Sequence, residues 1–425
     1  MTVVSLPIKN LPNSRSIGPD AVRAFAAVLV VYLHGCIPYL VHKMPGLVWP
    51  VSDATNGIVD AIFWAIEIFI MPFFLVISGF FAYRALVATD GFSFLKSRAN
   101  RLLRPLLFGI LILLPIILYI WMIGLVAEGR MPVVKLRSLK VPQPYRDQIW
   151  GLSHLWFLLY VFLYSALMVG VNRVLRNRIP MRMRPSLRRT SAILIPAVGA
   201  LTLVFAPEVV FGFQHAFLPV FSKWLYSGSF FAGGAALANF DPKFRSINRL
   251  AGRHLLLGAC ATVIAVLLGC WTLRLDPEQA RSASSTWLVS ITLATTTVLA
   301  AWSLALGVIG MSNRSSVWLV KHKRTCQAIE YLSGASFWIY LVHHPIVGLV
   351  HIDLKFLAPS MDPLTKSLLA ALIAIACGLG SYEYIVRTTR FGRFIGLTSK
   401  RPTEGTPVSW GEASKKPRRS VRIAA

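Results

Sequence analysis

The chain has 425 residues, of which 55% are hydrophobic and only 14% are charged, and its mean hydropathy is +0.61. A soluble protein carries about one quarter charged residues, so this composition excludes an ordinary soluble enzyme. The formal net charge of +27 does not indicate a nucleic-acid-binding protein, because membrane proteins concentrate Lys and Arg in their cytoplasmic loops.

Apolar runs near the spanning length of about 20 residues recur along the chain, which predicts an all-α polytopic membrane protein. We expect about ten transmembrane helices, at roughly 20–41, 58–83, 105–126, 154–172, 191–206, 220–239, 254–272, 286–310, 329–351 and 366–386. The fifth is short and is interrupted or bounded by Pro196 and Pro207. The first carries Arg23 and His34 and lacks a clear cleavage site, so we interpret it as a retained helix rather than a signal peptide.

Loop charge predicts the orientation of the chain. With a cytoplasmic N-terminus, the cytoplasmic segments hold most of the 44 Lys and Arg residues, so we expect both termini in the cytoplasm. We divide the chain into a cytoplasmic N-terminus at 1–19, a membrane domain at 20–390 and a basic, disordered cytoplasmic tail at 391–425. The outside loop 127–153 is an exception with five basic residues, and either a missed helix or a loop that handles an anionic or sugar substrate would explain it.

The sequence contains no pattern typical of a metal site or a nucleotide-binding loop. The five cysteines show neither paired nor metal-ligand spacing, so we interpret them as packing residues and expect no metal; they are Cys36, Cys260, Cys270, Cys326 and Cys377. No Walker or GxGxxG loop is present, which argues against a nucleoside-triphosphate-driven machine.

Arg23 and His34 are the most informative residues of the first span. They are eleven positions apart, so they share one stripe of a helix and lie about 16 Å apart along its axis. Such side chains are costly in a membrane and normally face a protein interior or a watery cavity. Arg23 could instead extend to the lipid headgroups. His34, in the outer half, could be a hydrogen-bonded packing residue or a general base.

Two further ionisable groups are expected at the depth of His34. They are Glu67 in the second span and His343 in the ninth, so the three side chains predict a shared polar cavity. Glu67 could orient His34, bind a substrate hydroxyl or form a structural pair. Pro345 frees a backbone carbonyl, which helices tolerate where they line such a cavity. Metal binding is less expected, because the neighbouring histidines lack ligand spacing.

Two groups of residues lie near the expected membrane surfaces. Arg84, Arg101 and Arg104 lie on one stretch that we expect to be cytoplasmic. They are either ordinary positive-inside charge or a site that clamps phosphate groups. His154 and Trp156 open the fourth span at the outer face. For His154 and Trp156 we favour a role as an interfacial anchor over a surface on which a sugar stacks.

The small residues at 233–236 permit close helix packing. The packing could lie within one chain or between copies, so the sequence leaves the oligomeric state open.

Four motifs, in chain order, resemble those of the acyltransferase-3 family of membrane acyltransferases. They are Arg23 and His34 with ten residues between them, FFLVISGFFAYR ending at Arg84, RANRLLRP with Arg101 and Arg104, and IEYLSGASFWIYLVHHP with Glu330, Tyr340 and His343. HLWFLLYVF, which contains His154 and Trp156, is similar to the branch of the family that modifies glucans.

The resemblance implies an enzyme that moves an acyl group, acetyl or succinyl, from a cytoplasmic acyl-CoA or similar thioester to a hydroxyl of a periplasmic or cell-surface carbohydrate. The expected location is the bacterial inner membrane, with several passes. The expected partners are the lipid bilayer, the acyl-CoA donor and the carbohydrate acceptor, without nucleic acid. No permanently bound cofactor is expected. A transporter that exports a glycan or an anion is the alternative, because intramembrane polar residues also build substrate paths.

The resemblance and the residue patterns together lead to a hypothesis for the site. His34 acts as general base or relays the acyl group, and Arg23 holds the donor near the cytoplasmic mouth. Glu67 and His343 orient His34 or the acceptor. The candidate substrate-binding residues are Arg84, Arg101, Arg104, Glu330, Tyr340, His154 and Trp156.

Overall fold

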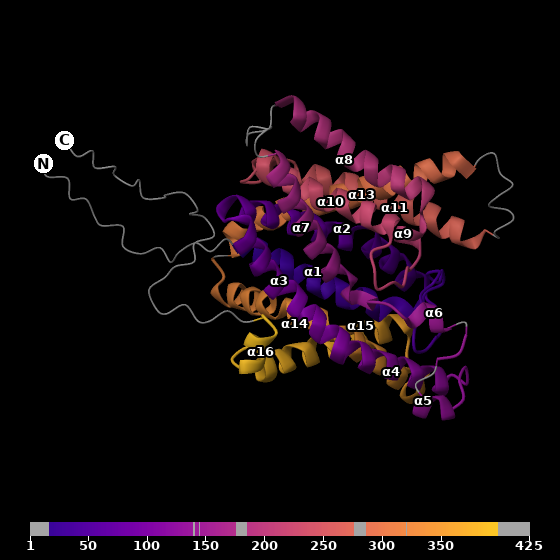
Figure 1. The fold of residues 1–425 in the computed structure, drawn as a ribbon. Coiled ribbons are helices and arrows are strands. Elements are labelled where there is room, and N and C mark those ends of the chain that lie inside the picture. Colours follow the sequence, from indigo (N-terminus) through magenta and orange to yellow (C-terminus); the bar gives the residue numbers. More distant parts are fainter. Residues whose placement is uncertain are drawn as a thin grey trace, which may run out of the picture.

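The computed structural model describes residues 17–138, 141–143, 145–175, 185–275, 286–319 and 321–397. Every regular element within these ranges is helical (Figure 1). Nine helices in the described ranges are long and apolar enough to cross a membrane. The predicted all-α polytopic fold is therefore confirmed.

The long helices form one bundle, with short helices at its ends. The long ones are α1 (Ile17–Cys36), α2 (Gly57–Ala88), α3 (Gly91–Phe108), α4 (Leu114–Ala127), α7 (Trp156–Leu175), α8 (Pro185–Phe205), α10 (Phe221–Phe240), α11 (Arg245–Arg274), α13 (Thr286–Leu319), α14 (Lys323–Leu357) and α15 (Pro363–Ser381). The short elements are η1 (Ile37–Tyr39), η2 (Gly109–Leu113), α5 (Val134–Ser138), α6 (Tyr145–Ile149), η3 (Ser153–Leu155), α9 (Glu208–Phe211), η4 (Tyr382–Val386) and α16 (Arg390–Phe394). In Figure 1, α5, α6 and α9 lie at one end of the bundle and α16 at the other.

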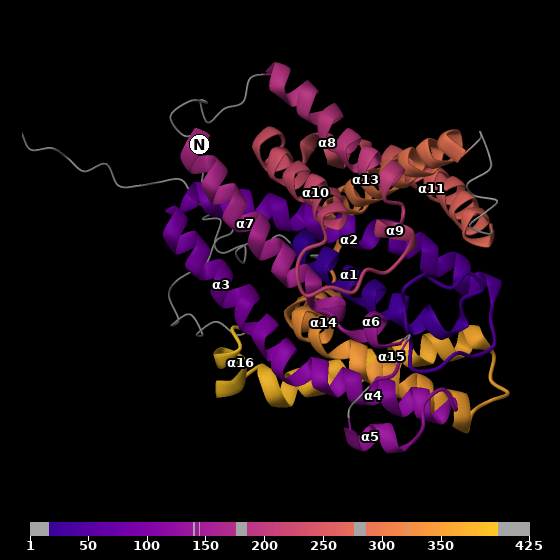
Figure 2. The same ribbon diagram turned by 45° about the vertical axis from the view of Figure 1, so that its right-hand side comes forward.

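The third span is longer than its predicted range of 105–126. Helix α3 continues through the π-helical turn η2 into α4, so one helical run extends from Gly91 to Ala127 (Figure 2). Most of the stretch 84–104, which we expected to connect two spans, is therefore helix. The Asp90 side chain starts this helix, because it accepts hydrogen bonds from the backbone N–H groups of Phe92 and Ser93.

The fifth and sixth predicted spans are both helices. The fifth is α8, which contains Pro196 inside it and ends before Pro207. The sixth is α10, which carries Lys223 and is not among the nine helices apolar enough to span. It packs against α2 and α8, so it still belongs to the bundle.

The segment 127–153, which we expected to be an outside loop, contains no missed span in its described part. Its two helices, α5 and α6, have five residues each, which is too short to cross a membrane. Arg130 pairs with Glu128 at 3.3 Å, and Lys140 lies outside the described residues.

The helical structure extends slightly past residue 390, where we expected the tail to begin. In α16, Phe391 packs against the rings of Phe108 and Trp338. The remaining predicted tail at 398–425 and residues 1–16 of the predicted N-terminus lie outside the described residues.

Helix α1 lies in the middle of the bundle (Figure 2). It contacts α2, α13, α14 and α15. This position explains how one helix carries both Arg23 and His34, since neighbouring helices cover much of the face that bears them.

Glycine allows the backbones of α2 and α10 to touch. A Cβ atom at Gly79 would lie 2.0 Å from the Phe231 carbonyl oxygen, and one at Gly234 would lie 2.0 Å from that of Val76. The small residues near 233 therefore serve close packing within one chain.

Replacing Gly234 by alanine is expected to lower the free energy of unfolding by about 1–3 kcal/mol, because the added methyl group meets backbone rather than a movable side chain. Thermal unfolding of the detergent-solubilised protein measures the change. Gly252→Ala is the matched control, since a Cβ atom there meets nothing within 4 Å. Equal stability of the two variants would contradict the close contact.

Candidate active site

Four histidines from three segments meet beside the middle of the bundle. His34 comes from α1, His343 and His344 from α14, and His154 from the turn before α7. The ring centre of His34 lies 4.8 Å from that of His343 and 5.1 Å from that of His344. The His154 ring stacks on His344 at 4.7 Å. The sequence predicted that His34 and His343 share one depth, but it assigned no role to His344.

The contacts of His34 determine which of its ring nitrogens carries the proton. Nδ1 lies 2.8 Å from the Val30 carbonyl oxygen, and since a carbonyl oxygen only accepts, Nδ1 is the donor. In the neutral ring, Nε2 therefore holds a free lone pair. Nε2 has no hydrogen-bond partner among the described residues. His34 is thus arranged as a base.

His343 stabilises the placement of the proton on Nδ1 of His34. Its Nδ1 lies 2.8 Å from the Tyr340 carbonyl oxygen and therefore donates, which leaves Nε2 as an acceptor in the neutral ring. This Nε2 lies 3.3 Å from Nδ1 of His34. The Nδ1–H of His34 is shared between Val30 and His343, so His343 holds the ring orientation of His34.

The carbonyl that Pro345 leaves free has a partner. Proline has no N–H, so the carbonyl of Leu341, four residues earlier, loses its helical hydrogen bond. His154 Nε2 donates to that oxygen at 3.1 Å. The Tyr340 hydroxyl in turn donates to the His154 carbonyl. The hydrogen bond that α14 lacks at Pro345 therefore positions His154, whose Nδ1 is buried without a partner among the described residues.

A cavity of about 100 Å³, here called the histidine cavity, lies in front of these rings. The polar side chains in its lining are those of His34, Glu67, His154, Lys223, Tyr226, Ser227, Tyr340 and His344. Ligand pockets usually measure about 300–1,000 Å³, so this cavity is large enough for reacting groups and too small for a whole sugar chain. His343 does not line the cavity but lies directly behind His34.

Lys223 and Glu67 face the histidine cavity together. They come from α10 and α2 and interact electrostatically, but no hydrogen bond or ion pair joins them among the described residues. Lys223 is 9% exposed, and its ammonium lies 3.9 Å from the centre of the Trp156 ring. The ammonium is therefore held beside the cavity by an aromatic face instead of a carboxylate.

The sequence does not single out Lys223, because its position at the start of the sixth span places it among the basic residues expected on the outer side. The available signal was a Lys followed by a long apolar run, FSKWLYSGSFF, since an ionisable group inside a span is a candidate functional residue.

Three predicted substrate-binding residues reach the histidine cavity. They are Tyr340, His154 and Trp156. For the last two we favoured an interfacial anchor; His154 is 6% exposed, and Trp156 is half-buried with its ring under Lys223. Both rings point into the protein, where Leu341 and Lys223 hold them.

The other predicted substrate-binding residues lie far from His34. Glu330 is exposed and precedes His343 by thirteen positions on α14, about 20 Å along the axis. Arg84 is at the end of α2 remote from Glu67, and it is exposed, as are Arg101 and Arg104 on α3. The structure does not bring these four into the histidine cavity.

Arg23 lies on the first turns of α1, at the opposite end from His34. Its guanidinium is 3.7 Å from Asp20 and 5.9 Å from the centre of the Phe81 ring, and its side chain is 38% exposed. Asp20 also accepts a hydrogen bond from Ser333, which joins this end of α1 to α14. Arg23 is thus partly accessible beside Phe81 of the neighbouring α2, at the end where α1 begins.

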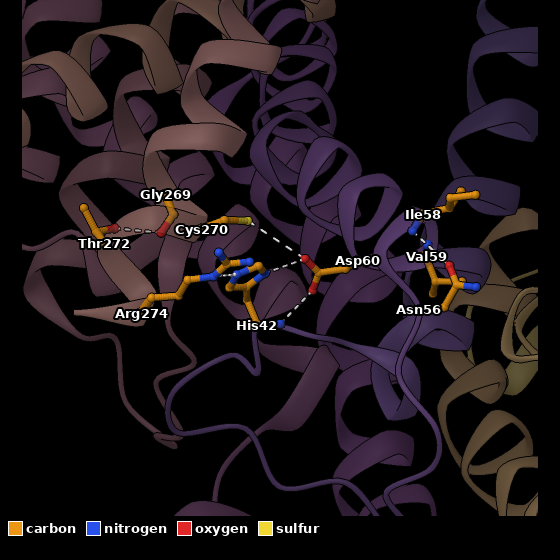
Figure 3. Close-up of polar contacts among 9 residues, drawn as sticks. All are labelled: His42, Asn56, Ile58, Val59, Asp60, Gly269, Cys270, Thr272 and Arg274. Atoms are coloured by element: carbon orange, nitrogen blue, oxygen red, sulfur yellow. Dashed lines mark hydrogen bonds and ion pairs between the residues drawn. The ribbon is translucent and has the colours of Figure 1, made fainter. Parts of the chain in front are cut away.

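A second polar cluster joins the end of α11 to α2 (Figure 3). Donor atoms of His42, Asp60 and Cys270 lie within 4.8 Å of one another, a grouping with metal-ligand character. Arg274 Nε donates to His42 Nε2 at 2.7 Å, so Nδ1 carries the proton and donates to Asp60 at 2.7 Å. A metal on Nδ1 would have to displace that proton beside a guanidinium. We therefore interpret the cluster as a set of hydrogen bonds that holds the helices together.

Comparisons with known proteins agree with this arrangement of motifs. The sequence model of the acyltransferase-3 family, described as an acyltransferase domain, matches residues 16–383. The glucans biosynthesis protein C of Salmonella paratyphi A is 26% identical over 385 residues, which cover 88% of this chain and 90% of that protein. The protein of the same name from Salmonella agona has the same identity and coverage. No solved structure matches the chain.

Proposed function

This chain belongs to the acyltransferase-3 family of membrane acyltransferases, and from that premise we propose that it acylates a hydroxyl group of a periplasmic or cell-surface carbohydrate. The proposed donor is a cytoplasmic acyl-CoA or similar thioester, and the acyl group is acetyl or succinyl. The observation that carries the proposal is the free Nε2 lone pair of His34 beside a polar cavity. The carbohydrate acceptor is supported by the relatives named for glucan biosynthesis.

The chemistry we propose is direct transfer with His34 as general base. Nε2 takes the proton of the acceptor hydroxyl while its oxygen attacks the thioester carbonyl carbon. Lys223 offsets the negative charge that develops on the carbonyl oxygen. The tetrahedral intermediate expels the thiolate, which recovers the proton from Nε2. One ester and one free thiol result, and His34 returns to its starting form.

The donor would enter at the opposite end of α1. Arg23 and Arg84 there, with Arg101 and Arg104 on α3, supply guanidinium groups that match phosphate oxygens. About 16 Å of helix separates Arg23 from His34, so a long thioester arm is needed to reach the base. An acyl-CoA inside and a glycan outside require a membrane that borders the cytoplasm, which in bacteria is the inner membrane.

Glu67 and Trp156 are the proposed contacts of the acceptor. A carboxylate on the cavity wall accepts hydrogen bonds from sugar hydroxyls, and an indole ring packs against the apolar face of a sugar. The histidine cavity admits the reacting hydroxyl, while the rest of the carbohydrate stays outside it.

Replacing Arg23 by alanine is expected to raise the KM for the acyl-CoA donor by about 10–100-fold, because a charge-assisted hydrogen bond contributes about 1.5–3 kcal/mol. The kcat value should change little. Steady-state kinetics at saturating acceptor measures both constants. Arg324→Ala, an exposed arginine on the first turn of α14, is the control. An unchanged donor KM in the Arg23 variant would remove Arg23 from the donor site.

Mass spectrometry of surface and periplasmic glycans tests the function itself. Cells that contain the protein should carry a glycan heavier by one acyl ester, and the mass increment identifies the acyl group. Cells without the protein should lack it. If instead the glycan is unmodified in cells with and without the protein, and accumulates inside the cells without it, the chain is an exporter. The proposal of acyl transfer is then wrong.

A further inference from the structure

A second and larger cavity adjoins the histidine cavity. Its volume is about 380 Å³, within the range of ligand pockets, and we call it the lateral cavity. The two cavities share Leu47, Phe213 and His344 in their walls. The rest of the lateral cavity is built from η2 and α4, the loop after η1 and the segments next to α7 and α9.

The wall of the lateral cavity is almost entirely apolar. Ile110, Leu114, Ile117 and Leu118 line it from η2 and α4, and the indole of Trp121 lies among them. No Lys or Arg is among the described residues that line it. A sugar would leave its hydroxyl groups unpaired here, and the phosphates of a nucleotide would lack a counter-charge. The occupant must therefore have an apolar body.

Exposed residues line part of the lateral cavity, next to the exposed apolar side of α4. Three lining residues, Pro115, Trp150 and Phe217, are exposed, the last two by 50% and 46%. Leu111 and Ile116 beside them on the helical run are also exposed, as expected for the lipid face of a span. An apolar rim on this face admits a molecule from the bilayer more readily than one from water.

Besides His344 and Ser153, the wall holds the imidazole of His215. Both ring nitrogens of His215 are buried without a hydrogen-bond partner among the described residues. Burial, with the charge of nearby Lys223, lowers the pKa of His215 to about 4, so the ring is neutral at physiological pH. A neutral imidazole offers one donor and one acceptor. The cavity therefore suits an apolar chain that carries a carbonyl.

We propose that the lateral cavity binds one hydrocarbon chain of a membrane phospholipid, from the leaflet on the His34 side, with His215 donating to its ester carbonyl. The chain would pack against Trp121, whose ring stacks on His344 at 4.9 Å with an interplanar angle of 7°. His344 stacks in turn on His154. A bound lipid would thus support one wall of the histidine cavity. This proposal does not rest on the acyltransferase function.

Photo-crosslinking tests the site without an activity assay. The purified full-length protein is reconstituted in phosphatidylcholine whose chain carries a diazirine, irradiated, and mapped by peptide mass spectrometry. Label is expected on Ile117 and Trp121, which are only 5% and 4% exposed, as well as on exposed Leu111. Label confined to exposed residues such as Leu111 would overturn the proposal, and this result needs no variant.

Two variants sharpen the test. Leu118→Trp fills the cavity and should remove the label from Ile117 and Trp121, whereas Leu111→Trp, on the lipid face, should not. His215→Phe keeps the volume but loses one hydrogen bond, so labelling at limiting lipid should fall about fivefold. Undiminished internal labelling in Leu118→Trp would show that the lipid chain does not occupy this cavity.

Discussion

Replacing His34 by alanine is expected to lower the rate of acyl transfer by about 10²–10⁴-fold, the usual contribution of a general base. The reason is specific to one atom. Val30 and His343 hold the Nδ1–H of His34, so Nε2 is the only ring atom left to take a proton. The measurement is the rate of ester formation on purified acceptor glycan by the protein reconstituted in vesicles.

A second histidine variant serves as the matched control for His34→Ala. His322→Ala removes an exposed imidazole just before α14, and full activity is expected. The activity of His343→Ala should fall between those of His34→Ala and His322→Ala. Val30 still fixes the proton on Nδ1 of His34 after the second acceptor of that proton is lost. Acylation by the His34 variant at the wild-type rate, with normal membrane insertion, would rule out His34 as the base.

Replacing Lys223 by methionine is expected to lower kcat by about 10²–10³-fold, as the loss of one oxyanion-stabilising group does in other acyl-transfer enzymes. Lys223 lines the histidine cavity with its ammonium over the Trp156 ring. Because no ion pair among the described residues offsets the cost of burying this cation, the same variant should be at least as stable as the wild type. Single-turnover kinetics and thermal unfolding together measure the two effects.

The opposite signs of these effects separate catalysis from structure. A structural lysine would lose stability and activity together on replacement. Glu67→Gln supplies the comparison, since it removes the other charge of the cavity while keeping its shape. It should impair acceptor binding more than the chemical step. If Lys223→Met unfolds at a lower temperature and keeps its kcat, Lys223 supports the helix packing and takes no part in the reaction.

Much of this protein could be predicted from local sequence alone. Spans follow from apolar length, and the shared face of Arg23 and His34 follows from helical periodicity, because both depend on neighbours within a few turns. The free carbonyl before Pro345 is equally local, since proline removes a single N–H. Local signals of this kind indicated the helical class, the helix at the fifth span and the common depth of His34 and His343.

The tertiary structure decided which of these groups act together. The Leu341 carbonyl meets His154 across 187 positions, and Lys223 reaches the cavity of His34 from a helix that sequence spacing does not place beside it. Periodicity determines the face and depth of a residue on its own helix. Which helices are neighbours depends on packing over the whole bundle, including the backbone contact of α2 with α10 that only glycine permits.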